Sequence, residues 1–170
     1  MWRVLRPVLL AAAVTALLAV PSAQAATSVK FVVTSYTTVT LTHDTKPKGK
    51  VNAGDSVDFK DLLVTTADNE LGKKKGKPVG YDAGTVLYTS PTTQKIEGVT
   101  TFPGVGTLTF RGAMTLRKDG TVHVPVVKGT GSFKGAKGTL IIGQGDKNGQ
   151  KAPNTYVIKV PNPVCTGHCA

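Results

Sequence analysis

Apolar and polar residues alternate with a period of two along most of the chain beyond residue 25, which is the pattern of half-buried antiparallel strands. In the first such segment Val29, Phe31 and Val33 share one face, and the segment continues to His43 beyond an irregularity near Ser35. Gly and Pro recur between the segments, and this part of the chain shows almost no helical period. The pattern predicts an all-β protein.

Seven further strands are predicted, joined mostly by short turns. Their approximate ranges are 56–65, 81–89, 95–101, 107–116, 121–127, 139–142 and 156–160. A hairpin turn at Lys118, Asp119 and Gly120 joins two of them. Eight strands in one domain favour a closed barrel or a sandwich, and closure into an eight-stranded antiparallel β-barrel removes the exposed sheet edges. The interior of such a barrel holds side chains or one small ligand.

The segment from Val127 to Gly143 contains a glycine-rich connection between two runs of β-branched residues. Within ten residues it carries Gly129, Gly131, Gly135 and Gly138. This spacing is typical of a chain that turns tightly without leaving a sheet. Phe133 is the one large apolar residue inside the connection, so we expect it to plug one end of a hydrophobic core.

The first 25 residues have the features of a cleavable signal peptide. Arg3 and Arg6 precede an apolar run over 8–20, and Ala23 and Ala25 form a small-x-small cleavage site. The apolar run is too short for a comfortable membrane span, so no stable span is expected after cleavage. We therefore predict export, with cleavage after Ala25, and a secreted protein. The predicted organisation is a signal peptide (1–25), a β-barrel domain (26–162) and a C-terminal tail (163–170).

The two cysteines lie in the tail, as Cys165 and Cys169. Because an exported chain enters an oxidising compartment, we expect a disulfide bond between them. The alternative is a metal site in which His168 joins both thiolates. Three ligands lack the fourth that a closed zinc site needs, so no metal is predicted.

The chain is strongly basic, with a formal net charge of +11 that falls to about +9 when Arg3 and Arg6 are removed. A basic surface favours polyanions such as an anionic cell-surface polymer. Nucleic acid is disfavoured, because basic and aromatic residues are not interleaved in the way that base stacking requires. Lys73 to Lys77 contains four lysines, which is typical of a solvated loop. The glycine-rich segment lacks the spacing of a nucleotide-binding loop, and no cofactor is predicted.

Four motifs, in this order, resemble the allene oxide cyclase barrel family, which includes the plant dirigent proteins and secreted bacterial relatives. They lie at 54–63, 76–84, 106–112 and 127–138. The resemblance covers roughly Phe31 to Val160, nearly the whole chain after the leader. It implies an eight-stranded antiparallel β-barrel with a largely apolar interior cavity, in agreement with the strand pattern.

The resemblance also bears on chemistry. Allene oxide cyclases use a Glu and an Asn of the first strand and a Cys of the third, where this chain has Thr and Ser between Val33 and Ser35, and Val86. Allene oxide cyclisation is therefore not expected. The dirigent pattern, whose polar groups bind and protonate quinone methides, is matched by His43 and Asp44.

The glycine-rich connection departs from the dirigent pattern at two positions. Ser132 stands where dirigent proteins have Asp, and Lys137 stands where they have Arg. A lysine holds a phenolate or carboxylate as a point charge, without the planar fork of arginine. Arg111, Lys137, Ser132 and Phe133 are the candidate ligand-binding residues.

Asp61 stands within an apolar strand, where a carboxylate needs a partner or an elevated pKa. Lys60 or Arg111 would serve as such a partner. Asp61 and Asp44 are the candidate catalytic carboxylates, and the alternative for Asp61 is a structural ion pair or an exposed position.

The favoured hypothesis is a secreted barrel whose cavity binds a small, mostly apolar ligand, phenolic or polyketide-like, and steers its coupling or cyclisation. One alternative is a cyclase or isomerase that uses a barrel carboxylate as acid or base. The other is a basic cell-surface barrel with a filled interior and no ligand. The sequence is compatible with both a monomer and an oligomer.

Overall fold

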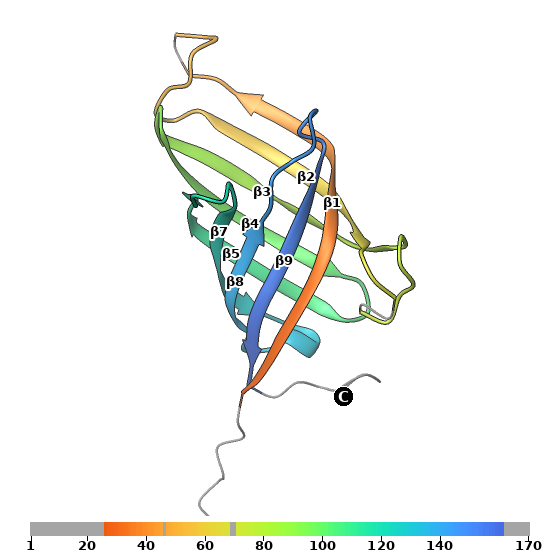
Figure 1. Ribbon diagram of the computed structural model, residues 1–170. Helices are drawn as coiled ribbons and strands as arrows, with labels where there is room; N and C mark the ends of the chain where they lie inside the picture. Colours follow the sequence, from red (N-terminus) through yellow and green to blue (C-terminus); the bar gives the residue numbers. More distant parts are fainter. Residues whose placement is uncertain (1–25, 46, 69–70, 162–170) are drawn as a thin grey trace, which may run out of the picture.

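The computed structural model describes residues 26–45, 47–68 and 71–161, and the predicted signal peptide and the cysteine pair lie outside these ranges. Within them the chain forms β-strands and one short 3-10 helix (Figure 1). No described helix is long and apolar enough to cross a membrane. The elements are β1 (Thr27–His43), β2 (Ser56–Thr65), β3 (Pro78–Ser90), β4 (Thr93–Phe102), β5 (Gly106–Ala113), β6 (Thr115–Leu116), β7 (Val122–Gly129), η1 (Gly131–Phe133), β8 (Lys137–Ile142) and β9 (Lys151–Val160).

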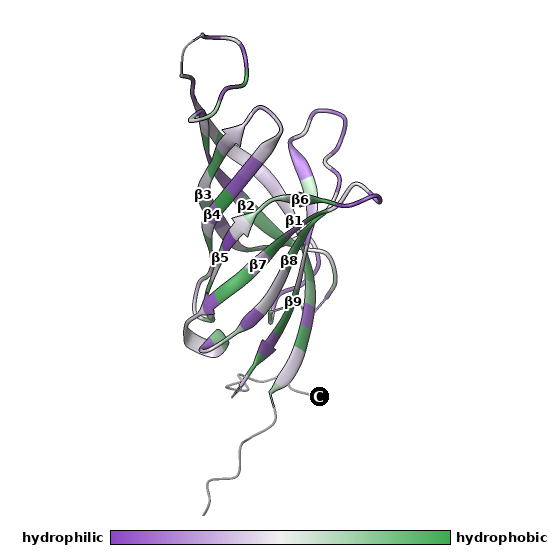
Figure 2. Cartoon of the chain, turned by 90° about the vertical axis from the view of Figure 1, so that its left-hand side faces the viewer, coloured by the Kyte–Doolittle hydropathy of each residue, from purple (hydrophilic) through white to green (hydrophobic). Residues whose placement is uncertain are grey.

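The strands form one antiparallel sheet that closes on itself. Their order is β5-β4-β3-β2-β1-β9-β8-β7, and a pairing between β5 and β7 completes the cylinder. The two-residue strand β6 extends the sheet beside β7. Buried and exposed residues alternate along much of the strands. Figure 2 shows hydrophobic and hydrophilic residues succeeding one another along the same strands. The predicted eight-stranded antiparallel β-barrel is confirmed.

Two details of the strands, an irregularity in β1 and the start of β9, differ from the prediction made from the sequence. The irregularity in β1 is a shift of register between Thr37 and Val39, slightly later than expected. β9 begins at Lys151 rather than near Tyr156. Its first half was hidden because Asn154, a buried polar residue, occupies an inward position in the alternation.

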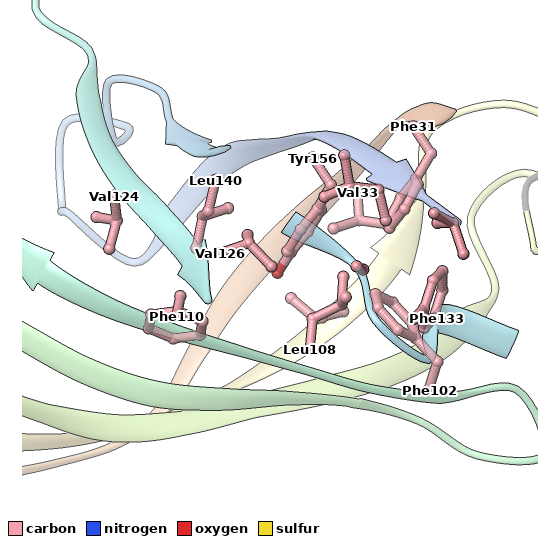
Figure 3. Close-up of a cluster of buried hydrophobic side chains, with 14 of the residues drawn as sticks. Phe31, Val33, Phe102, Leu108, Phe110, Val124, Val126, Phe133, Leu140 and Tyr156 are labelled. Carbon is pink, nitrogen blue, oxygen red and sulfur yellow. The ribbon is translucent and has the colours of Figure 1, made fainter. Parts of the chain in front are cut away.

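Aromatic side chains fill one end of the barrel (Figure 3). Phe31 stacks on Tyr156 with ring centroids 4.8 Å apart, and Phe102 meets the edge of Phe31 at 5.5 Å. Phe133 lies 6.1 Å from Phe31 and 5.7 Å from Phe102, and it is buried. Phe133 therefore plugs this end of the core, as the glycine-rich segment predicts.

The glycine-rich connection allows Phe133 to turn inward. Gly131 begins η1 at a positive φ of 59°, where a Cβ would lie 2.3 Å from the carbonyl oxygen of Val105. The backbone N–H of Ser132 donates to that same carbonyl at 2.9 Å. Since this close approach excludes a side chain at residue 131, glycine is required there.

Candidate functional site

The other half of the barrel holds an open cavity of about 370 Å³, to which the β8–β9 turn contributes Gly149. Its wall is mostly apolar, with a small number of polar groups. The lining residues are Ser35, Thr37, Val57, Phe59, Asp61, Asp82, Val86, Ile96, Phe110, Met114, Leu140, Ile142, Gly149, Ala152 and Asn154. A volume of this size lies near the lower end of the range for small-molecule sites, about 300–1,000 Å³.

Two glycines face each other across β3 and β4 and shape the wall of the cavity. Gly84 and Gly98 are register partners, with Phe59 of β2 opposite Gly84 and Phe110 of β5 opposite Gly98. A Cβ on Gly98 would lie 2.4 Å from Cζ of Phe110, and one on Gly84 would lie 3.0 Å from Cζ of Phe59. Both rings therefore pack against bare backbone, which holds them to the wall and leaves the middle of the cavity open.

Two aspartates from neighbouring strands lie side by side within the cavity. Asp61 of β2 and Asp82 of β3 are register partners, so their side chains leave the sheet on the same face. Ser35 Oγ donates a hydrogen bond to Asp61 Oδ2 at 2.7 Å. The other oxygen of Asp61, Oδ1, and Oδ1 of Asp82 are buried and have no hydrogen-bond partner among the described residues. The partner of Asp61 is thus a serine, rather than the lysine or arginine that the sequence suggested.

Asp82 has the most perturbed carboxyl group of the cavity. It is 2% exposed, and burial, assisted by the negative charge of Asp61, raises its pKa to about 8. At neutral pH the Asp82 carboxyl therefore keeps its proton and is a hydrogen-bond donor. A protonated acid beside a second carboxylate is an arrangement that supports general acid–base chemistry.

A buried hydroxyl pair lies between the carboxylates and the aromatic core. Tyr156 of β9 and Thr100 of β4 hydrogen-bond across the barrel, with their oxygens 2.8 Å apart. Burial, followed by the negative charge of Asp82, raises the pKa of Tyr156 well above its usual value, so the phenol stays neutral. Asn154, 3% exposed, adds another buried oxygen without a partner among the described residues. A polar layer therefore separates the filled half of the barrel from the hollow half.

The remaining predicted site residues lie away from this cavity. Asp44 is exposed and lines a separate depression of about 300 Å³ beside the β1–β2 turn. Arg111 projects from the outer face of β5 and forms an exposed ion pair with Glu97 of β4. Lys137 is exposed and donates to the carbonyl of Val127, while Ser132 belongs to η1. Of the two predicted catalytic carboxylates, the structure brings only Asp61 to the cavity.

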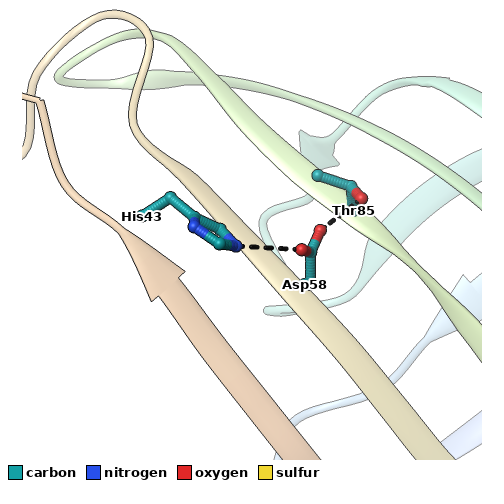
Figure 4. A network of polar contacts seen from close by, with 3 residues as sticks. All are labelled: His43, Asp58 and Thr85. Carbon is teal, nitrogen blue, oxygen red and sulfur yellow. Dashed lines mark hydrogen bonds and ion pairs between the residues drawn. The ribbon is translucent and has the colours of Figure 1, made fainter.

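A small network of polar contacts lies on the outer face of the barrel, away from the cavity (Figure 4). His43 Nε2 lies 3.0 Å from Asp58 Oδ2, and Thr85 donates to the other oxygen of Asp58 at 2.5 Å. These hydrogen bonds, that from Thr85 first, hold the pKa of Asp58 below its usual value. His43, the other residue of the dirigent-like pair, therefore bonds to an exterior carboxylate.

No group of three or more His, Cys, Asp or Glu side chains suited to a metal ion occurs in the part of the chain that the structure describes.

Comparisons with solved structures decide the class of fold. The chain superposes on a pyocyanin demethylase with a TM-score of 0.59 and 22% identity, over 76% of this chain and 99% of that one. It superposes on a pterocarpan synthase dirigent protein with a TM-score of 0.55 and 19% identity, over 79% and 88%. It superposes on a Diels Alderase from Streptomyces koyangensis with a TM-score of 0.56 and 17% identity, over 85% of this chain and 74% of that one. The protein has a dirigent-like barrel fold.

At these identities the likeness of the dirigent-like barrel to its neighbours concerns the fold, which confirms the resemblance that the four motifs carry. No family model matches the chain, and no curated protein matches it by sequence. The site must therefore be argued from this barrel's own residues.

Sequence reasoning missed Asp82, Asn154 and Ser35 as members of the site. Asp82 lies in one of the four family motifs, between Gly80 and Gly84, where glycines leave no apolar alternation to mark an inward position. Its signal becomes visible only when β3 is aligned with β2, because Asp61 then stands directly opposite.

Proposed function

We propose that the protein is a secreted dirigent-like barrel that binds a small, mostly apolar ligand, phenolic or polyketide-like, and steers its coupling or cyclisation. The observation that carries this proposal is the cavity, whose apolar wall surrounds a few buried polar atoms that lack partners among the described residues. Stable proteins rarely leave buried carboxylate oxygens unpaired, and functional sites are the common exception. The neighbouring folds named as a dirigent protein, a demethylase and a Diels Alderase support this kind of role.

A fluorescence titration with N-phenyl-1-naphthylamine, a neutral apolar dye, tests the proposal. Two matched variants come from adjacent residues of β3: Val86 lines the cavity, and Leu87 faces solvent. We expect one saturable site in the wild type and in Leu87→Phe, and at least about tenfold weaker binding in Val86→Phe, because the added ring occupies cavity volume. Absence of saturable binding by the wild type, or equal binding by both variants, would overturn the proposal.

The same titration separates the cavity from the basic exterior. Binding through Lys73 to Lys77 weakens steeply as ionic strength rises, whereas binding of a neutral dye inside the barrel barely responds. A parallel titration with the anionic dye 1-anilinonaphthalene-8-sulfonate supplies the comparison. Binding of the anion that disappears at high salt, with no saturable site for the neutral dye, would favour the alternative of a basic cell-surface barrel.

The raised pKa of Asp82 favours a second candidate function, a cyclase or isomerase that uses barrel carboxyl groups for proton transfer. Protonated Asp82 would donate to a ligand carbonyl while Asp61 accepts a proton from the adjacent carbon. The probe reaction is exchange of the hydrogens next to the carbonyl of 2-tetralone for deuterium in D₂O, followed by NMR. We expect acceleration by the wild type and a loss of at least about tenfold in Asp82→Asn and in Asp61→Asn.

Asp44→Asn is the matched control for this reaction, because Asp44 is exposed and lies outside the cavity. Exchange that is equally fast in the wild type and Asp82→Asn would exclude the acid–base role. The binding role would stand if the dye still bound.

A further inference from the structure

The polar atoms of the cavity are mostly hydrogen-bond acceptors. Asp61, Asp82 and Asn154 each contribute a buried Oδ1 without a partner among the described residues. The hydroxyl of Ser35 already donates to Asp61. The described residues that line the cavity include no Lys, Arg or His. The polar layer is thus rich in acceptors and contains no positive charge.

Two of these side chains are more than nine-tenths buried and belong to the cavity wall. Asp82 is 2% exposed and Asn154 is 3% exposed, and their strands, β3 and β9, are separated in the sheet by β2 and β1. The Asn154 amide can turn either its oxygen or its NH₂ group to a ligand. The protonated Asp82 carboxyl supplies a single O–H donor, so the remaining oxygens of the two carboxyl groups are acceptors. Their unpaired oxygens therefore point to a ligand that supplies the missing donors.

A charge on the ligand would interact strongly with the Asp61 carboxylate in this mostly apolar cavity. A carboxylate, phosphate or phenolate would place a second negative charge near Asp61, inside a wall of Val, Ile, Leu and Phe where charges are poorly screened. A protonated nitrogen would instead donate to the carboxylate oxygens in charge-assisted hydrogen bonds. The basic exterior does not reverse this preference, because none of the described lysines and arginines lines the cavity.

We infer that the ligand presents hydrogen-bond donors to the Asp61–Asp82 pair and that its polar end is a protonated nitrogen, as in a small aromatic amine or a protonated nitrogen heterocycle. This rests on the proposed function, since it names the ligand class of the same cavity. It also assigns Asp61 and Asp82 as the residues that determine specificity between cationic and anionic ligands. The preference runs against the protein's own net charge, +11 for the full sequence and about +9 without Arg3 and Arg6, which would attract anions without selectivity.

Three probes that share one apolar ring system test the inference by displacement of N-phenyl-1-naphthylamine at 150 mM salt and pH 7. They are 1-naphthylmethylamine, which is cationic, 1-naphthalenemethanol, which is neutral, and 1-naphthoate, which is anionic. We expect the amine to bind at least about tenfold more tightly than the carboxylate. The double variant Asp61→Asn, Asp82→Asn should lose this preference, and Arg111→Ala, on the outer face, should keep it.

The outcomes separate the two proposals. If neither the dye nor the neutral alcohol binds, the proposed function fails. If both bind and 1-naphthoate binds as tightly as the amine, the cavity is a binding site but the inference is wrong. If the double variant fails to fold, as its thermal transition would show, Asp61→Asn alone gives the same test. An unchanged preference in that single variant would remove Asp61 from the role.

Discussion

Asp55 and Asp82 are both almost fully buried aspartates, 4% and 2% exposed, yet the protein surrounds them in opposite ways. Asp55, at the end of the β1–β2 turn, accepts hydrogen bonds from the backbone and side chain of Thr45 and from the backbone of Asn52, each at 2.6 Å. Asp82 has an oxygen without a partner among the described residues and a second carboxyl group opposite. The surroundings lower the pKa of Asp55 and raise that of Asp82.

The difference separates a carboxylate that stabilises the folded turn from one that takes part in the proposed function. At Asp55 the donors favour the charged form, so ionisation stabilises the folded turn. At Asp82 burial and a like charge disfavour the charged form, so ionisation destabilises the barrel. A protein retains such a group where the cavity uses it, because an apolar residue at the same position would be less costly.

The largest expected effect is a change in the pH dependence of stability in Asp82→Asn. The folded pKa of about 8 exceeds the usual 3.8, so between these values the folded protein binds more protons than the unfolded chain. The contribution of Asp82 to the free energy of unfolding therefore falls as pH rises, by about 1.4 kcal/mol per pH unit at most. Asp82→Asn removes this loss, so its Tm should exceed that of the wild type at pH 8 and approach it near pH 4.

Chemical denaturation at several pH values measures this difference directly. A wild type and an Asp82→Asn variant whose free energies of unfolding run parallel from pH 4 to pH 9 would contradict the assignment of Asp82 as a proton-holding carboxyl.

A smaller effect of opposite sign is expected for Asp55→Asn. Because the hydrogen bonds lower the folded pKa, the contribution of Asp55 is present above pH 3.8 and is lost as the pH falls through the folded pKa. The Tm of the variant at pH 7, measured without dye, should be lower than that of the wild type by about 5 °C or more. The folded variant should still bind the dye. Differential scanning calorimetry at pH 7 and pH 3 gives the measurement, and a Tm that rises at pH 7 would break the contrast with Asp82.

The smallest effect is expected at the exposed ion pair of Arg111 and Glu97, whose side chains are 61% and 58% exposed. Arg111→Ala should change the free energy of unfolding by less than about 1 kcal/mol, because solvent screens such pairs. It should leave the affinity for the dye unchanged. A loss of dye binding would show that the outer groove beside Arg111, of about 410 Å³, is the ligand site instead of the interior.

The period-two alternation and the turn residues are local signals, and they were sufficient to predict eight antiparallel strands in a barrel or a sandwich. The resemblance of the four motifs then favoured the barrel. It also marked Asp61, whose carboxylate interrupts an apolar strand. Asp82 escaped because its neighbours Gly80, Ala83 and Gly84 provide no comparable contrast. The pairing of the two aspartates is set by the register of β2 on β3, which no single segment reveals.

The other predicted ligand-binding residues lie outside the cavity because of their positions relative to the barrel wall. Arg111 lies on the face of β5 opposite Leu108 and Phe110, and that face is the exterior. Lys137 and Ser132 belong to the glycine-rich connection at the filled end, on the far side of the aromatic core from the cavity. A motif resemblance gives the place of a residue along the chain, whereas its access to the cavity depends on packing in three dimensions.

The most direct test of the central claim, that the ligand enters the cavity above Asp82, uses Met114. Met1 and Met114 are the only methionines, and Met114 lines the cavity. In protein labelled with ¹⁵N throughout and with ¹³C at the methionine methyl groups, the Met114 signal is identified by its loss in Met114→Leu. The account predicts that this signal shifts progressively as N-phenyl-1-naphthylamine is added. An unchanged Met114 signal, with shifts confined to the amides of Lys73 to Lys77, would contradict it.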